Sequence, residues 1–285
     1  MSQSRSSTPF LLGSLLSAAA AYGLSLYAMA QTQQALMTKF ELRLVLIGAE
    51  MALALPPLFV AALLASRIPG LYRFHPLRRW AIPLTVALGL ALWTLSLGVF
   101  EAQYVLVRPP QQYLDQFQGL HETLRPGSAM GWVFSIAAIA VAPAICEEIL
   151  FRGLLVPVLR NAVGSALAIV ISGVMFGLIH IDAMPGPGGG QVAVYYRVPF
   201  AFILGMLLAK IRIDTESLWP SMIAHATLNA TTFVVVFLAP DQKGVMPDPQ
   251  PFVALGMLAL GGFGAQFLLR RIAVLDSGDR AVAAP

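Results

Sequence analysis

The chain has 285 residues, of which 58% are hydrophobic and only 11% are charged. Soluble domains usually carry about 25% charged residues, so this composition excludes an ordinary soluble domain and indicates a surface that faces lipid. The net charge of +4, from 18 basic and 14 acidic residues, is too small to indicate a nucleic-acid-binding protein.

Eight long apolar segments follow one another along the chain, and each is a candidate membrane-spanning helix. A spanning helix needs roughly 20 mostly apolar residues. The fifth and sixth segments are short, and the fourth is polar in its second half. We therefore predict an all-α polytopic membrane protein with about eight transmembrane helices, folded as one integral membrane domain over residues 1–285. The segments lie at about 9–30, 43–65, 81–100, 131–155, 164–181, 197–213, 217–239 and 251–270.

The basic residues between these segments predict how the chain lies in the membrane. If the N-terminus is cytoplasmic, eleven loop bases fall on the cytoplasmic side and six on the other side. The positive-inside rule then favours a multi-pass protein of the cell membrane with both termini in the cytoplasm. The eleven are Arg5, Arg67, Arg73, Arg78, Arg79, Arg160, Lys210, Arg212, Arg270, Arg271 and Arg280; the six are Lys39, Arg43, Arg108, Arg125, Arg197 and Lys243.

The first apolar segment has an alternative interpretation as a cleaved signal peptide. The sequence "YAMAQ" at 27–31 places Ala28 and Ala30 in an A-x-A pattern. The apolar stretch before it is longer than a signal core of about 7–15 residues, and its leader carries one arginine. These features favour a retained helix, and cleavage stays open at this point.

The stretch "AICEEILFRGLL" at 144–155 places two glutamates and an arginine inside the fourth apolar segment. Three such charges at the bilayer centre cost roughly 8–10 kcal/mol on insertion scales. The eleven Val, Ile, Leu and Phe residues of 131–155 return only about 3–7 kcal/mol. This helix is therefore a poor lipid-facing span, and its polar face is expected to point into the bundle.

Helical spacing separates the three charges into different roles. Glu148 and Arg152 stand at i and i+4, so they share a face and can form an ion pair. Glu147 is rotated by about 100° from Glu148 and is the freer carboxylate. A purely structural ion network that holds helices together is the alternative interpretation.

Two further apolar segments carry polar residues at the same spacing. "FGLIH" places Phe176 four residues before His180, and "HATLN" places His225 four residues before Asn229. A single intramembrane histidine is usually a packing residue. Polar groups in hydrocarbon need partners, however, so we expect the glutamates, histidines and asparagine of these three helices to converge.

This set of side chains fits hydrolysis of a peptide bond by an activated water. A carboxylate beside a histidine can take a proton from water, and a histidine and an amide can donate hydrogen bonds to an oxyanion. Zinc held by Glu147, His180 and His225 is a possible alternative, although the H-E-x-x-H motif is absent. Cys146 is the only cysteine; a thiol nucleophile is the less favoured alternative, because a buried structural cysteine is commoner in an apolar stretch.

The motifs "APAICEEILFRG", "FGLIH" and "HATLN" resemble, in this order, the three motifs of the CPBP intramembrane proteases, the CAAX-protease and bacteriocin-processing group. The motif-bearing protease core would cover about 131–239. The resemblance implies that Glu147 is the general base, helped by His180, and that His225 and Asn229 stabilise the oxyanion. It implies supporting roles for Glu148, Arg152 and Phe176. The family has been described both as metalloproteases and as metal-independent glutamate proteases, and the sequence does not decide between them. We expect an enzyme without a cofactor, because the possible zinc ligands are also needed as base and oxyanion donors.

The sequence therefore predicts an intramembrane endopeptidase that acts on a peptide or lipidated-protein substrate within the lipid bilayer. The alternative is a non-catalytic membrane binding, transport or bacteriocin-immunity protein that keeps the same polar cluster. Repeat symmetry with paired broken helices, which would indicate a transporter, is not visible in the sequence.

Overall fold

The structure, a computed structural model, describes residues 8–64, 68, 70–109, 111, 122–181, 197–238 and 250–282. The elements in this part of the chain are all helical, which confirms the predicted fold class. They are α1 (Thr8–Leu36), α2 (Leu42–Leu64), α3 (Ala81–Leu106), α5 (Ala129–Ile136), η1 (Ala137–Val141), α6 (Ala142–Glu148), η2 (Ile149–Leu155), α7 (Val156–Val163), α8 (Ser165–Leu178), α10 (Val198–Thr215), α11 (Trp219–Leu238) and α12 (Pro251–Val282), where η marks a π-helix.

Each of the eight predicted segments corresponds to a helix, but the count of eight spans is not confirmed. Six helices in the described part are long and apolar enough to cross a membrane: α1, α2, α3, the continuous helix 129–163, α11 and the part of α12 up to Ala273. The other two fall short for different reasons. Helix α8 has only 14 residues, and α10 carries Lys210, Arg212 and Asp214 near its end.

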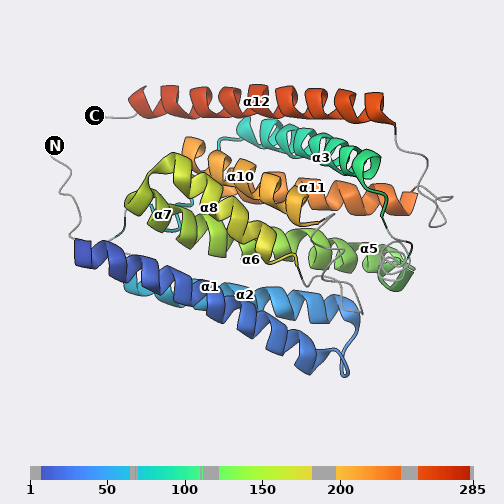
Figure 1. The fold of residues 1–285 in the computed structure, drawn as a ribbon, viewed down its shortest axis with the longest axis horizontal. Helices are drawn as coiled ribbons and strands as arrows, with labels where there is room; N and C mark the ends of the chain where they lie inside the picture. The colour runs from blue at the N-terminus through green and yellow to red at the C-terminus, as the bar shows by residue number, and fades with distance from the viewer. Residues whose placement is uncertain are drawn as a thin grey trace.

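The helices form a bundle in which the continuous helix 129–163 occupies the interior (Figure 1). Helices α3 and α12 pack against each other on one side, and α1 and α2 pack against each other on the opposite side. Between these pairs lie α8, α10 and α11, with α11 against α3 and α8 against α10. The three helices that carry the sequence motifs are therefore central.

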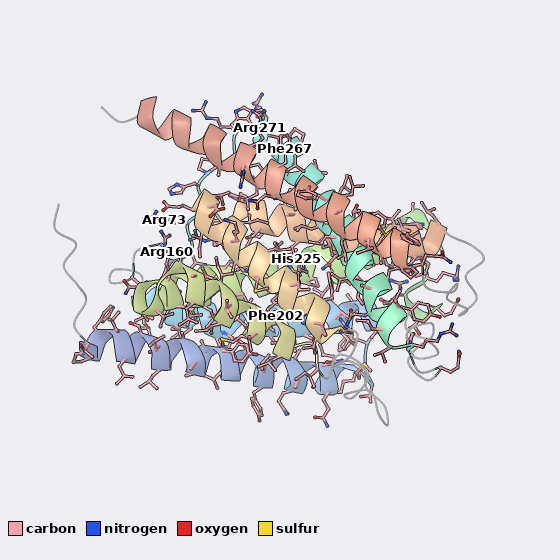
Figure 2. The ribbon with its side chains drawn as sticks, turned by 45° about the horizontal axis from the view of Figure 1, so that its top comes forward. Arg73, Arg160, Phe202, His225, Phe267 and Arg271 are labelled. Atoms are coloured by element: carbon pink, nitrogen blue, oxygen red, sulfur yellow. The ribbon has the colours of Figure 1, made fainter. Side chains whose placement is uncertain are left out.

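Large apolar side chains cover the outside of the bundle. Phe252, Leu260 and Phe263 on α12 are 89%, 71% and 77% exposed. Figure 2 shows Phe267 and Arg271 on this outer helix, away from the helices around His225. Such a surface would aggregate in water but is matched to lipid chains. Together with the six apolar helices, it identifies an integral membrane protein.

The continuous helix 129–163 changes its winding twice, and each change precedes a proline. Pro143 follows the π-helix η1, and Pro157 follows the π-helix η2. A proline clashes with the carbonyl four residues earlier and lacks the N–H that would bond it. A π turn accommodates this disruption: the N–H of Ala142 bonds to the carbonyl of Ala137, five residues back. The short segment that carries Glu147 and Glu148 thus lies between two wider turns, a feature frequent at functional sites.

Glycines let α8 and α10 approach closely beside this segment. A Cβ on Gly205 would lie 2.8 Å from the Cβ of Phe176 and 3.0 Å from the Cα of Gly173. No larger residue fits there without moving a helix. The close approach brings the backbone of α10 within reach of side chains on η2.

Candidate active site

Arg152 and Glu148 form the ion pair expected from their spacing. Arg152 Nη1 lies 2.9 Å from Glu148 Oε1, and both side chains are fully buried. Arg152 Nη2 donates a hydrogen bond of 2.9 Å to the carbonyl oxygen of Gly205. The guanidinium carbon lies 4.6 Å from the centre of the Phe176 ring. Arg152 therefore connects η2 with α10 and α8, and it compensates the charge of Glu148.

His225 reaches the same carboxylate from α11. Its Nδ1 lies 3.2 Å from Glu148 Oε1, and since an ionised carboxylate only accepts, this nitrogen carries the proton. The other ring nitrogen, Nε2, lies 3.9 Å from Glu147 Oε2. Figure 2 shows His225 in the interior of the bundle, and the residue is 3% exposed. Glu148 thus orients the imidazole so that its second nitrogen faces Glu147.

Glu147 is the less engaged of the two adjacent glutamates. Its Oε2 atom is buried and has no hydrogen-bond partner in the described part of the structure. The whole residue is 7% exposed. A buried carboxylate oxygen without a donor is costly to keep, and such groups concentrate at functional sites.

His180 lies beside Phe176 and outside the regular helix. Helix α8 ends at Leu178, so the predicted segment 164–181 is longer than the helix observed. The backbone N–H of His180 bonds to the carbonyl of Gly177, and its Nδ1 lies 2.8 Å from the carbonyl oxygen of Phe176. A carbonyl only accepts, so Nδ1 carries the proton and Nε2 of a neutral ring is an acceptor.

The ring of Phe176 contacts both imidazoles. Its centre lies 5.1 Å from that of His180 and 5.9 Å from that of His225. Among the described residues, the structure gives no hydrogen bond or ion pair between His180 and Glu147. The three motifs therefore meet around Phe176 and the Glu148–His225 contact, with His180 at the edge of the cluster.

Asn229 lies one turn after His225 on α11 and reaches the first π turn. Its Nδ2 atom donates to the carbonyl oxygen of Ile139 at 3.4 Å. An amide nitrogen carries two hydrogens, so this contact uses one donor. The bond joins α11 to η1, while the residue is only half-buried.

The same donors do not form a good zinc site. Structural and catalytic zinc takes at least three protein ligands at about 2.0–2.3 Å. No group of three His, Cys, Asp or Glu side chains within the described ranges is arranged to hold a metal ion. In both imidazoles Nδ1 makes the contact, with Glu148 or with a carbonyl, which leaves Nε2 as the nitrogen that a metal would use. Because no three of these side chains gather around one point within the described ranges, the arrangement does not match a three-ligand metal centre.

Sequence reasoning did not single out Glu50, an acidic residue on a helix that packs against the helix of Glu147. Glu50 lies on α2, which packs against α6, and its Oε2 atom is buried with no hydrogen-bond partner among the described residues. The available signal was simple: it is the only acidic residue in the apolar run of α2, and ionisable residues inside spans are usually functional. It belongs to none of the three motifs, and the sequence does not show which helices pack together.

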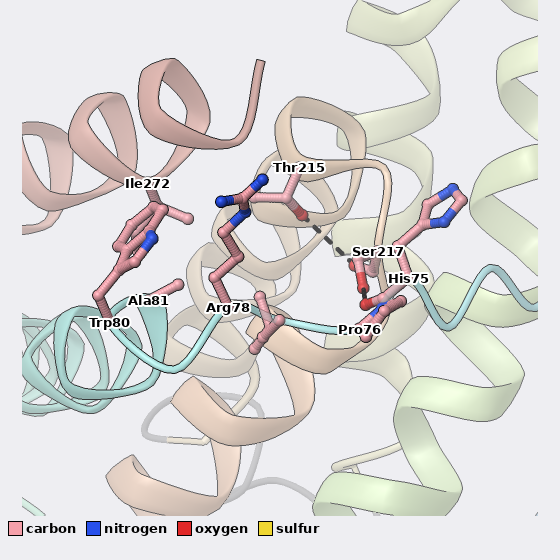
Figure 3. Close-up of a pocket in the computed structure, with 9 residues that line it drawn as sticks. His75, Pro76, Arg78, Trp80, Ala81, Thr215, Ser217 and Ile272 are labelled. Atoms are coloured by element: carbon pink, nitrogen blue, oxygen red, sulfur yellow. Dashed lines mark hydrogen bonds between the residues drawn. The ribbon is translucent and has the colours of Figure 1, made fainter. Parts of the chain in front are cut away.

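Two surface hollows lie away from this cluster. One, drawn in Figure 3, is lined by residues that include His75, Arg78 and Ser217, and the other lies between α3 and α10. In the first, the hydroxyl of Ser217 donates to the carbonyl of His75 at 2.9 Å, so it is engaged with the main chain. Neither hollow has an acidic side chain among its lining residues, which leaves the motif cluster as the candidate active site.

Comparison with known proteins agrees with the three motifs. The family model described as "Type II CAAX prenyl endopeptidase Rce1-like" matches residues 129–231, the range that contains every motif residue. No curated protein and no solved structure gives a significant match to the chain. Through residues 129–231 the chain matches the CPBP/CAAX protease family, and the family predicted from its motifs is confirmed.

Proposed function

We propose that this protein is an intramembrane endopeptidase in which Glu147 activates a water molecule. The family match supports a CAAX-type protease in general. One observation carries the finer proposal. Glu147 Oε2 is buried without a hydrogen-bond partner among the described residues, and Nε2 of His225 lies 3.9 Å from it. The Glu148–Arg152 pair fixes that imidazole, so the two reacting groups are held before a substrate arrives.

The reaction needs one proton to move twice. Glu147 removes a proton from water, and the oxygen of that water forms a bond to the carbonyl carbon of the substrate. The carbonyl oxygen becomes an oxyanion. When the C–N bond breaks, the proton on Glu147 passes to the leaving nitrogen, and Glu147 returns to its starting state.

The oxyanion needs donors, and hydrogen-bond geometry limits which atoms can serve. His225 donates Nδ1–H to Glu148, so Nε2 can donate to the oxyanion only when this nitrogen also carries a proton. Asn229 keeps a second N–H beside the one given to Ile139. Nε2 of His180 is an acceptor and suits a hydrogen of the attacking water, which is the helping role that the family resemblance implies.

The supporting residues hold this arrangement without touching the reacting atoms. Glu148 and Arg152 orient His225, and the Phe176 ring contacts His180 at a tilt and His225 edge-on. The family implies a prenylated peptide or protein as substrate. The loop charges support a cytoplasmic position for both termini.

Purified protein in liposomes is expected to cleave a fluorogenic peptide that ends in a prenylated CAAX sequence. Mass spectrometry of the products should find a new C-terminal carboxylate on the prenylated fragment and a new amine on the released one. The same peptide without its prenyl group is the matched control and should be cleaved more slowly, because it lacks the lipid anchor. Binding of the peptide without new chain ends would favour the non-catalytic alternative.

Cleavage is also expected to be independent of a bound metal. Dialysis against a strong chelator should leave the rate unchanged, because in the proposed reaction Glu147 is the base and the histidines form hydrogen bonds instead of binding a metal. Elemental analysis of the active protein should find far less than one transition metal per chain. Loss of activity on chelation, restored by zinc, would contradict this part of the proposal.

A further inference from the structure

Three arginines and one glutamate meet where the ends of α7 and α10 lie beside the segment that precedes α3. Arg160 belongs to the last turn of α7, Arg212 to the last turn of α10, and Arg73 to the segment before α3. Arg73 Nη1 lies 2.9 Å from Glu216 Oε2, and Arg160 Nη1 lies 3.8 Å from Glu216 Oε1. Figure 2 shows Arg73 and Arg160 together at one edge of the bundle. Three positive charges thus face one negative charge, which leaves this cluster with a net charge of +2.

Arg212 is the buried member of the cluster, with 4% of the residue exposed. Its Nη2 atom donates a hydrogen bond to the carbonyl oxygen of Gly70, a neutral partner. Its Nε atom is buried and has no hydrogen-bond partner in the part of the chain that the structure describes. A buried charge is costly unless an opposite charge compensates it. The environment of Arg212 therefore favours a bound anion.

Gly70 leaves an open space that two of the guanidinium groups face. Its φ of +91° is a left-handed conformation that glycine adopts without strain. A Cβ atom built on Gly70 would lie 4.0 Å from Arg212 Nη2 and 4.0 Å from Arg73 Nε, the two contacts found within that distance. Each guanidinium has five N–H donors, of which the backbone and Glu216 use only some. Paired planar donors of this kind suit the oxygens of a phosphate group.

Aromatic side chains indicate that this cluster lies at the level of the lipid headgroups. Trp219 begins α11 shortly after Glu216, and its ring centre lies 5.5 Å from that of Phe74, which follows Arg73. Trp219 and Phe74 are 42% and 44% exposed. Exposed tryptophan is enriched at the membrane–water interface, where the phosphates of phospholipids are located. The loop charges also predict that this side is cytoplasmic, and the leaflet on that side is rich in anionic lipids.

We propose that Arg73 and Arg212 bind the phosphate of an anionic phospholipid in the space beside Gly70, with Arg160 adding to the positive potential. The net charge of the cluster, the uncompensated charge of Arg212 and the interfacial position together favour this ligand. No step of the proposed proteolysis uses these residues, so the lipid site holds or fails independently of that function.

The segment that carries Arg73 is already hydrogen-bonded to two parts of the bundle. The N–H of Tyr72 donates to the carbonyl oxygen of Gly153 on η2 at 3.4 Å, and the N–H of Leu218 donates to the carbonyl oxygen of Arg73 at 2.9 Å. A phosphate held by both Arg73 and Arg212 joins this segment to α10 as well. Because such a ligand binds the folded protein alone, it should raise the melting temperature.

Titration of the full chain in detergent with short-chain phosphatidylglycerol tests the site. The melting temperature should rise as this anionic lipid is added, and phosphatidylcholine of the same chain length, which has no net charge, should give a much smaller rise. Arg73→Gln changes a side chain that is 40% exposed and should weaken phosphatidylglycerol binding roughly tenfold or more, as for one hydrogen bond to a charged group. Equal rises with the two lipids would overturn the proposal.

Lys210→Gln is the matched control for Arg73→Gln. Lys210 is 41% exposed, lies near the end of α10 and pairs with the carboxylate of Asp214 at 2.7 Å, so its removal changes the net charge equally. This variant should bind phosphatidylglycerol as the unaltered protein does. A loss as large as that in Arg73→Gln would mean attraction to surface charge in general and would contradict a defined site.

Two further measurements separate the guanidinium groups and the lipid from simpler explanations. Arg212→Lys keeps the charge but loses the planar pair of donors, so it should also weaken phosphatidylglycerol binding. Unchanged binding in both Arg212→Lys and Arg73→Gln would remove the basis of the site. Inorganic phosphate, added alone at millimolar concentration, should not reproduce the rise in melting temperature. A rise equal to that with phosphatidylglycerol would assign the arginines to a free anion and count against a lipid.

Discussion

The Glu147→Gln variant is expected to lose proteolysis by about 10²–10⁴ in kcat, the usual contribution of a general base. Glutamine has nearly the shape of glutamate but cannot accept a proton at neutral pH. KM should change little, because the remaining groups of the cluster stay in place. Cleavage of the prenylated peptide, followed by fluorescence and checked by mass spectrometry, measures both constants.

The same variant is expected to fold as well as the unaltered protein. Glu147 Oε2 is buried and receives no hydrogen bond among the described residues, so the substitution removes an uncompensated carboxyl oxygen. The melting temperature in detergent should therefore be equal or slightly higher. Loss of activity together with a stable fold separates a chemical role for Glu147 from a structural one.

Cys146→Ala is the matched control, since Cys146 precedes Glu147 and is also buried. It should cleave at the unaltered rate, because no step of the proposed reaction uses the thiol. An inactive but folded Cys146→Ala would support a thiol nucleophile. An active Glu147→Gln would contradict the proposed base directly.

The sequence was sufficient to predict the ion pair of Glu148 with Arg152, because both residues lie on one helix. Positions i and i+4 face the same way even where the helix winds more widely, and the pair forms at 2.9 Å. It also distinguished Glu147 as the freer carboxylate. Such predictions succeed because helical geometry alone determines them.

Contacts between helices are the part that the sequence could not supply. Helix α2, which carries Glu50, packs on α6, and nothing in the spacing of either helix indicates this. The π turns are a second case. Pro143 and Pro157 follow the two π turns, but a proline is equally compatible with a kink, a break or a π turn, so the sequence does not select among them.

The position of His180 shows the same limit at a helix end. The apolar pattern continued to residue 181, whereas the helix stops at Leu178 and a tight turn carries His180 to the carbonyl of Phe176. Helix ends depend on local hydrogen bonds that hydropathy does not report. The motif F-x-x-x-H thus predicted the neighbouring pair correctly, although the pair is joined by a turn.

Arg152→Met is expected to give the largest loss of stability, about 3–5 kcal/mol, as for other broken buried ion pairs. Methionine fills a similar volume but leaves the Glu148 carboxylate without its cation. It also leaves the carbonyl of Gly205 without the donor that it has at 2.9 Å. The measurement is the free energy of unfolding in detergent, by denaturant titration or by the shift in melting temperature.

A double variant and a surface control make this result specific to the buried pair. Glu148→Gln combined with Arg152→Met should be less destabilised than Arg152→Met alone, because the uncompensated charge is removed as well. Arg160→Met, at the edge of the bundle in Figure 2, removes a pair of 3.8 Å with Glu216 and should cost less than about 1 kcal/mol. Equal stability of Arg152→Met and the unaltered protein would show that Glu148 is neutral in the fold. The orientation of His225 by a carboxylate, on which the proposed oxyanion donor depends, would then fail as well.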